Sequence, residues 1–267
     1  MRSIQHKKEA LWFYRFVSPL YDRWVNPLFW TVPLRAEALT LAQLDDPHLR
    51  TLDVGAGTGF STEGIVERVN AEAVTMLDQS PDQLGRAAKK PRLAGCAKVL
   101  GDAERLPFAD NSFDRYVSCG SIEYWPDPAR AIAEAHRVVR PGGTVLLAGP
   151  LAPRDRLARF IADAWMLFPT ESQYREWFAG AGFEDTAILR MGAPWNGDPA
   201  RRHYAIAIAA QATEHGPPPA TAAGSERVDE PWTARRLLRF AAGALAGAVF
   251  VPIGLFLNLR ARRGGRR

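Results

Sequence analysis

The stretch Asp53-Val54-Gly55-Ala56-Gly57-Thr58-Gly59 decides the fold. Residues 49–54 are expected to form a buried strand that ends at these glycines, and residues 60–69 after them are expected to form a helix. Glycines at alternate positions let a ligand lie close against the backbone. The spacing differs from the G-x-G-x-x-G of dinucleotide-binding enzymes, so a diphosphate ligand is not expected. A purely structural turn is the alternative interpretation.

An acidic residue, Asp53, stands directly before these glycines. A carboxylate in this position suits a ligand that carries a cationic amino group and disfavours an anionic one. Together with the glycine spacing, it points to S-adenosyl-L-methionine as the ligand.

Strands and helices alternate along the rest of the chain. Further strands are expected at residues 73–77, 98–100, 114–118 and 144–148, and helices at residues 81–90 and 128–139. This alternation with short loops is typical of an α/β protein with a doubly wound parallel sheet. After a helix at residues 172–180, the strands at 186–190 and 203–210 have no long helix between them. They are expected to form an antiparallel pair at the sheet edge.

Acidic residues also follow the second and third expected strands. Asp78 is placed to accept both ribose hydroxyls, and Asp102 to accept the adenine amino group. Open α/β sheets bind ligands at the carboxyl ends of their strands, where these acids fall. The predicted cofactor-binding residues are Asp53, Gly55, Gly57, Gly59, Asp78, Gln79, Asp102, Ala103 and Ser118.

This combination resembles the class I methyltransferases over about residues 35–210. The resemblance implies a seven-stranded sheet with S-adenosyl-L-methionine over the first four strands. A closer resemblance, to the plastid MPBQ/MSBQ methyltransferases, covers about residues 6–202 and resumes near the C-terminus. These are the 2-methyl-6-phytyl- and 2-methyl-6-solanesyl-1,4-benzoquinol methyltransferases of tocopherol and plastoquinone synthesis. The stretches that carry it are His6–Phe16, Leu77–Pro81, Gly120–Pro128 and Asp163–Pro169.

The closer resemblance implies transfer of a methyl group to a ring carbon of a prenylated hydroquinone, without a metal. Glu123 is the candidate for polarising the ring hydroxyl; a loop or helix-cap carboxylate is the alternative. Tyr21 is a candidate to close over the cofactor. Tyr124, Trp125 and Trp165 are candidate substrate contacts, although each aromatic residue would also suit the core.

The charge distribution argues against nucleic acid as a partner. The chain carries a net charge of +5, but eight arginines and no acidic residue lie in residues 234–267, which leaves residues 1–233 at −3. A body of that charge repels a phosphate backbone. Only two cysteines, Cys96 and Cys119, are present, and the five histidines are scattered, so no metal site is expected.

Four regions are expected along the chain. Residues 1–48 form an aromatic N-terminal helical segment that acts as a lid or faces the membrane, residues 49–212 the methyltransferase domain, residues 213–233 a linker and residues 234–267 a membrane anchor. Within the last region, residues 240–259 carry no charge and would form a helix of about 30 Å, the thickness of the hydrocarbon core. A helix docked on the domain, or one that re-enters the same side of the membrane, is the alternative.

Membrane lipid is therefore an expected partner, beside the prenylated quinol. The catalytic domain is expected in the cytoplasm, or at the plastid inner envelope if the source is a photosynthetic eukaryote. Two other functions are considered. One is a methyltransferase for another lipid-soluble acceptor, such as a ubiquinone or menaquinone precursor, a sterol or a phospholipid. The other is a membrane-tethered protein that binds S-adenosyl-L-methionine without catalysis.

Overall fold

The computed structural model describes residues 30–153, 156–192, 203–214 and 241. Within this part of the chain, seven strands form one mixed sheet in the order β3-β2-β1-β4-β5-β7-β6. The first five strands in this order are parallel, and β7 is antiparallel to both β5 and β6. The bounds are β1 Thr51–Val54, β2 Val74–Asp78, β3 Ala97–Leu100, β4 Phe113–Cys119, β5 Val139–Pro150, β6 Ala187–Gly192 and β7 His203–Gln211.

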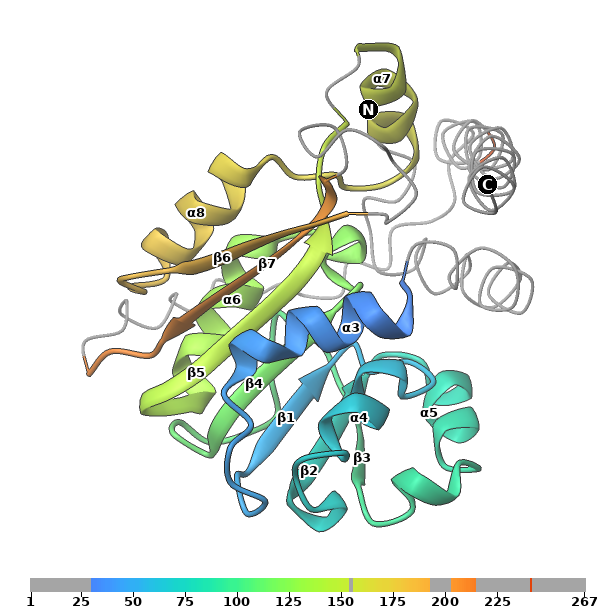
Figure 1. Cartoon of the computed structure of the whole chain (residues 1–267), viewed down its shortest axis with the longest axis vertical. Helices are drawn as coiled ribbons and strands as arrows, with labels where there is room; N and C mark the ends of the chain where they lie inside the picture. Colours follow the sequence, from blue (N-terminus) through green and yellow to red (C-terminus); the bar gives the residue numbers. More distant parts are fainter. Residues whose placement is uncertain (1–29, 154–155, 193–202, 215–240, 242–267) are drawn as a thin grey trace, which may run out of the picture.

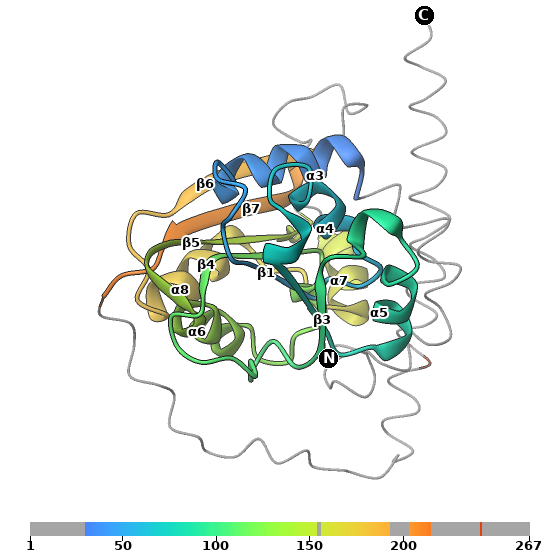
Figure 2. The same cartoon turned by 90° about the horizontal axis from the view of Figure 1, so that it is seen from below.

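Helices cover both faces of the sheet (Figures 1 and 2). The helices α3, α4 and α5 pack on one face, and α6 and α8 on the other. A further helix, α7, lies beyond the carboxyl ends of the parallel strands (Figure 1). The bounds are α3 Val32–Leu39, α4 Phe60–Ile65, α5 Pro81–Ala87, α6 Pro128–Val138, α7 Arg156–Trp165 and α8 Glu171–Gly180.

Alternation along the strands divides the core between the two faces. In β7, Ala205, Ala207 and Ala209 pack with the α3 side, whereas Ile206 and Ile208 pack with the α6 side. Small residues on one face and larger ones on the other follow from the period of two in a strand. The predicted doubly wound sheet and its antiparallel edge pair are confirmed.

The strand predictions hold to within two residues at each end, except for β5. Its first residue, Val139, pairs with Phe113 across a register irregularity, so the strand begins five residues before the predicted start at residue 144. The helix α5 ends at Ala87, earlier than predicted, because Lys90 precedes Pro91 and takes an extended conformation.

Helix α3 falls within the predicted N-terminal helical segment, whereas α7 has no counterpart in the sequence predictions. Helix α3 begins where the Thr31 hydroxyl accepts a hydrogen bond from the Leu34 N–H group at 3.3 Å. Its residues Leu34, Ala38 and Leu39 are buried in the core of the domain. The described part of the predicted N-terminal segment therefore packs as part of the domain.

Several predicted features lie outside the described residues. These are the aromatic stretch before Trp30, most of the linker and, apart from Ala241, the span at residues 240–259. The described helices include none that is both long and apolar enough to cross a bilayer.

The glycine that starts α4 generates a prediction about stability. Gly59 has a φ of 85°, and a Cβ there would overlap the Leu93 side chain and lie 3.2 Å from the Met76 methyl group. We expect Gly59→Ala to lower the free energy of unfolding by about 2 kcal/mol or more, through left-handed strain and overpacking. Gly85→Ala in α5 is the matched control, because its Cβ would enter open space and favour the helix. Denaturant titration of both variants measures this, and equal stabilities would contradict it.

Candidate functional site

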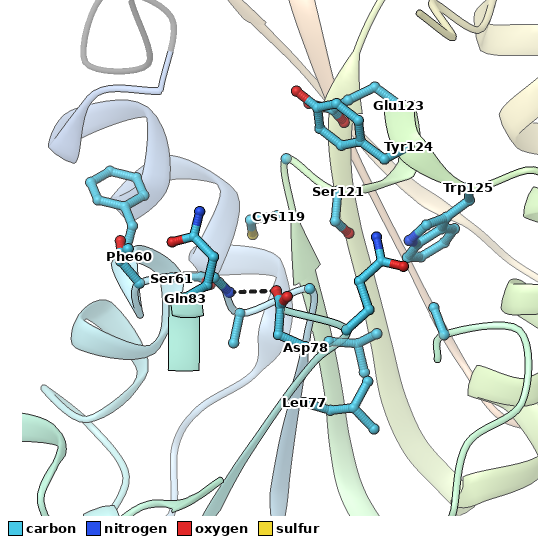
Figure 3. Close-up of a pocket in the computed structure, with 18 of the residues that line it drawn as sticks. Phe60, Ser61, Leu77, Asp78, Gln83, Cys119, Ser121, Glu123, Tyr124 and Trp125 are labelled. Carbon is cyan, nitrogen blue, oxygen red and sulfur yellow. Dashed lines mark hydrogen bonds between the residues drawn. The ribbon is translucent and has the colours of Figure 1, made fainter. Parts of the chain in front are cut away.

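A pocket opens at the carboxyl ends of β1, β2 and β4 and beside the loop after β3 (Figure 3). The loop after β1, the start of α4 and the loop after β4 form its walls. Its position is the one at which open α/β sheets bind ligands. The lining residues are Trp30, Val54, Gly55, Ala56, Gly57, Thr58, Phe60, Ser61, Leu77, Asp78, Gln79, Gln83, Gly101, Asp102, Ala103, Cys119, Gly120, Ser121, Glu123, Tyr124, Trp125 and Pro126.

The glycine loop is fastened to the end of β2 by Asp78. The Gly57 N–H group donates to one carboxylate oxygen of Asp78 at 2.8 Å (Figure 3). The Ser80 N–H group donates to the other at 2.8 Å. Burial raises the pKa of Asp78, although these backbone donors oppose the rise. Gly57 has a φ of 54° and no atom within 4 Å of a Cβ position. A ligand can therefore lie directly against the backbone at Gly57.

Asp53 lies behind the wall of the pocket and does not line it. Its side chain is fully buried, and one carboxylate oxygen accepts hydrogen bonds from the hydroxyls of Ser61 at 2.7 Å and Thr62 at 2.6 Å. Burial raises the pKa of Asp53 to about 6, against the effect of both hydroxyls. The direct ligand contact expected of Asp53 is not the arrangement seen. Asp53 instead holds Ser61, which does line the pocket.

Two other predicted residues also lie behind the wall. Gly59 faces the Leu93 side chain, and Ser118 is fully buried between strands. The Ser118 hydroxyl lies 2.8 Å from the Val54 carbonyl oxygen, to which it donates, and 2.6 Å from the Ser121 hydroxyl. Because side chains alternate along β1 and β4, only some residues near each strand end face the pocket.

The loop after β3 supplies the far end of the pocket. Asp102 and Ala103 line it there, together with Gln79 from the end of β2. One carboxylate oxygen of Asp102 accepts a hydrogen bond from the Glu104 N–H group at 3.0 Å, which fixes the direction of the side chain. The structure thus brings Asp78 and Asp102 to one pocket, as the sequence predicted.

A short 3₁₀ helix in the loop after β4, Ile122–Tyr124, carries Glu123 (Figure 3). Only 5% of the Glu123 surface is exposed, and burial raises its pKa to about 7. Among the described residues, one of its carboxylate oxygens has no hydrogen-bond partner. A buried polar atom without a partner is costly, so the arrangement suits a hydroxyl donor brought by a ligand.

Comparisons with known proteins identify the family. A methyltransferase-domain family matches residues 52–147. The 2-methyl-6-phytyl-1,4-hydroquinone methyltransferase 2 of Oryza sativa, named as chloroplastic, is 49% identical over 97% of this chain and 76% of its own length. The corresponding Arabidopsis thaliana enzyme is 48% identical over 97% of this chain and 78% of its own length. The chain belongs to this methyltransferase family.

A solved structure supports the fold assignment. The phosphoethanolamine N-methyltransferase 2 of Haemonchus contortus, in complex with S-adenosyl-L-methionine, aligns with a TM-score of 0.63 at 16% identity. The alignment covers 76% of this chain and 60% of that one. The predicted class I fold and the predicted cofactor are confirmed, and the chain is an S-adenosyl-L-methionine-dependent methyltransferase.

Two of the four predicted substrate-contact residues line the pocket. Tyr124 and Trp125 are buried and line the pocket beside Glu123. Tyr21 lies outside the described residues, and Trp165 is the last residue of α7. No group of His, Cys, Asp and Glu side chains suited to a metal occurs in the described part of the chain.

Several residues that line the pocket were not predicted as site residues from the sequence, among them Trp30, Phe60 and Ser121. Phe60 is held by Arg35, which donates to its carbonyl oxygen at 2.8 Å and lies 5.0 Å from its ring centre. A Cβ on Gly120 would lie 2.9 Å from the indole of Trp30, so these two residues are packed closely. Trp30 is the last of the aromatic residues that are frequent in the predicted N-terminal segment. This enrichment was the signal in the sequence that could have identified Trp30 as a site residue.

Proposed function

We propose that the protein transfers the methyl group of S-adenosyl-L-methionine to a ring carbon of a prenylated hydroquinone. The acceptor is of the 2-methyl-6-phytyl-1,4-hydroquinone or 2-methyl-6-solanesyl-1,4-hydroquinone type, as in the pathways to tocopherol and plastoquinone. The observation that carries this proposal is the buried carboxylate of Glu123, one of whose oxygens has no hydrogen-bond partner among the described residues. Glu123 lines the pocket of a chain that is 48–49% identical to such enzymes.

Glu123 supports this chemistry through the ring hydroxyl. A ring carbon beside a hydroxyl is a weak nucleophile, and it strengthens when the hydroxyl gives its proton or a hydrogen bond to a carboxylate. When bound, S-adenosyl-L-methionine would supply the electrophilic methyl group and would be released as its neutral thioether product. The methylated ring carbon would lose its hydrogen to solvent as a proton, and Glu123 would return the proton that it took, which restores the hydroxyl.

The cofactor-binding roles follow from the pocket walls. We assign the ribose hydroxyls to Asp78 and the adenine amino group to Asp102, with Gln79 and Ala103 beside them. Gly55 and Gly57 let the cofactor approach the backbone. The residues behind the wall, Asp53, Gly59 and Ser118, are assigned to holding these loops in place.

Asp78 generates the first functional prediction. Asp78→Ala should weaken S-adenosyl-L-methionine binding tenfold or more, because the ribose loses its acceptor and the Gly57 N–H group loses its partner. Asp78→Asn, which keeps one side-chain oxygen, should lose less. Calorimetric titration of both variants measures the affinities. An Asp78→Ala variant that binds S-adenosyl-L-methionine with wild-type affinity would contradict the assignment of the ribose to Asp78.

A membrane location is part of the proposal. Residues 240–259 are proposed to anchor the chain, with arginines on either side against anionic head groups. Helix α7 lies beyond the carboxyl ends of the parallel strands (Figure 1), and its Phe160 is 74% exposed. An exposed aromatic side chain on this helix supports contact with lipid. The relatives are chloroplastic, which favours the plastid inner envelope in a photosynthetic eukaryote. In a prokaryote the domain would face the cytoplasm.

One experiment tests the acceptor and the location together. The full chain is incubated with methyl-labelled S-adenosyl-L-methionine and liposomes that contain prenylated hydroquinones, sterols or phospholipid amines, and is then floated on a density gradient. We expect labelled hydroquinone and protein in the vesicle fraction. Turnover of a sterol or phospholipid alone would overturn the acceptor. Binding without any turnover would favour the non-catalytic alternative, and protein that stays at the bottom would overturn the anchor.

Glu123 generates the second functional prediction. Because its pKa of about 7 keeps it protonated at lower pH, the methyl-transfer rate of the wild-type protein should rise with pH through about 7. Glu123→Gln should lower the rate at pH 8 tenfold or more, which corresponds to about 1.4 kcal/mol, and its pH profile should lack this rise. Rates across pH 6–8.5 measure both effects.

Two controls separate this role from a loss of structure. Cofactor affinity should stay within about twofold of wild type, since Glu123 is assigned to the acceptor. The raised pKa means that ionisation of Glu123 destabilises the fold as pH rises from 4.5 to about 7. Glu123→Gln should therefore be no less stable than wild type at pH 8. Near-normal turnover in a folded Glu123→Gln protein would remove Glu123 from the mechanism.

A further inference from the structure

A second buried glutamate, Glu104, lies between the two ends of the pocket without lining it. It follows Asp102 and Ala103 in the loop after β3, and only 6% of its surface is exposed. The chemistry proposed above makes no use of this residue. Its contacts nevertheless join the part of the pocket assigned to adenine with the part assigned to the acceptor.

Three hydrogen bonds make this connection. The Glu104 N–H group donates to a carboxylate oxygen of Asp102 at 3.0 Å. The Glu104 side-chain carboxylate accepts from the Asp127 N–H group at 2.9 Å. The main-chain carbonyl oxygen of Glu104 accepts from the Arg130 guanidinium at 3.0 Å. Only the second of these bonds depends on the carboxylate, and it alone reaches the loop after β4.

Asp127 is the point at which that loop ends. Its side chain accepts a hydrogen bond from the Arg130 N–H group at 3.1 Å and caps α6. The preceding residues, from Glu123 to Pro126, all line the pocket. The Glu104 carboxylate therefore fixes the end of the segment that carries Glu123.

The same loop and the same helix are also joined away from the pocket. The Leu106 N–H group donates to Glu134 at 2.7 Å, and Arg137 donates to the Leu106 carbonyl oxygen at 3.1 Å. Neither Glu134 nor Arg137 lines the pocket. The attachment of the loop to α6 thus does not rest on Glu104, whose specific contribution is the link to Asp127.

We propose that Glu104 is a positioning residue that couples cofactor binding to acceptor binding. A cofactor bound at Asp102 stabilises the loop after β3. Through its hydrogen bond with the Asp127 N–H group, the Glu104 carboxylate then also stabilises the segment that carries Glu123. Coupling between two binding sites is reciprocal, so the acceptor tightens cofactor binding by the same factor. This inference rests on the proposed function, because the acceptor is taken to be a prenylated hydroquinone.

The test measures this factor without turnover. The full chain in detergent is titrated anaerobically with S-adenosylhomocysteine, the demethylated product, with and without 2-methyl-6-phytyl-1,4-hydroquinone. In wild type the hydroquinone should tighten binding about fivefold or more. In Glu104→Leu the factor should fall below about twofold. Its affinity without hydroquinone should stay near wild type, because the bond to Asp102 comes from the backbone.

Two variants serve as controls. Glu104→Gln keeps a side-chain oxygen for the Asp127 N–H group and should retain most of the coupling. Glu134→Leu removes the acceptor of the Leu106 N–H group, which is a link between the same loop and helix away from the pocket. It should keep the wild-type factor even if it lowers the melting temperature. In the labelled assay, the Michaelis constant for hydroquinone should rise severalfold in Glu104→Leu alone.

The outcomes separate the inference from the function on which it rests. Wild-type turnover of hydroquinone without coupling overturns the inference alone, as does Glu104→Leu that keeps the full factor. Equal loss in Glu104→Leu and Glu134→Leu would mean general destabilisation and would also overturn it. A wild-type protein that labels no hydroquinone overturns the proposed function, and this inference with it.

Discussion

One hydrogen bond sets the shape of the cofactor loop, from the Gly57 N–H group to the Asp78 carboxylate at 2.8 Å. The bond exists because β1 and β2 are parallel neighbours, with Val54 beside Leu77, so the loop and Asp78 leave the sheet together. The Leu77 carbonyl oxygen also accepts from Gly55 at 2.8 Å. These hydrogen bonds fix the backbone of the loop, so less ordering remains for binding.

Three carboxyl groups are buried near the carboxyl ends of the parallel strands, and they differ in the hydrogen bonds that compensate for burial. The pKa values of Asp53, Asp78 and Glu123 are all raised. Asp53 and Asp78 each receive two hydrogen bonds from nearby donors, which offset part of the desolvation of the ionised form. Among the described residues, one oxygen of Asp53 and one of Glu123 have no hydrogen-bond partner, but Asp53 lies behind the pocket wall whereas Glu123 lines the pocket. Of these two oxygens, that of Glu123 is therefore the one open to a hydroxyl from a ligand.

The sequence predictions were correct where a pattern of residues is compatible with one arrangement. The alternation of strands and helices determined the sheet, and the acids after β2 and β3 fell in one pocket. It failed where direction mattered, because nothing in the sequence says that Asp53 faces Ser61 and Thr62 instead of the pocket. Contacts distant in sequence were also out of reach. The link from Glu104 to Asp127 spans 23 residues and depends on how the loop folds.

Selection of the acceptor must depend on segments outside the shared sheet. The same sheet occurs in a solved phosphoethanolamine N-methyltransferase at 16% identity, so the fold does not determine what is methylated. Two such segments border this pocket: Trp30, which precedes α3, and the loop after β4. They meet where Trp30 packs against Gly120, three residues before Glu123. A side chain at position 120 would push these segments apart, so their close packing depends on a glycine there.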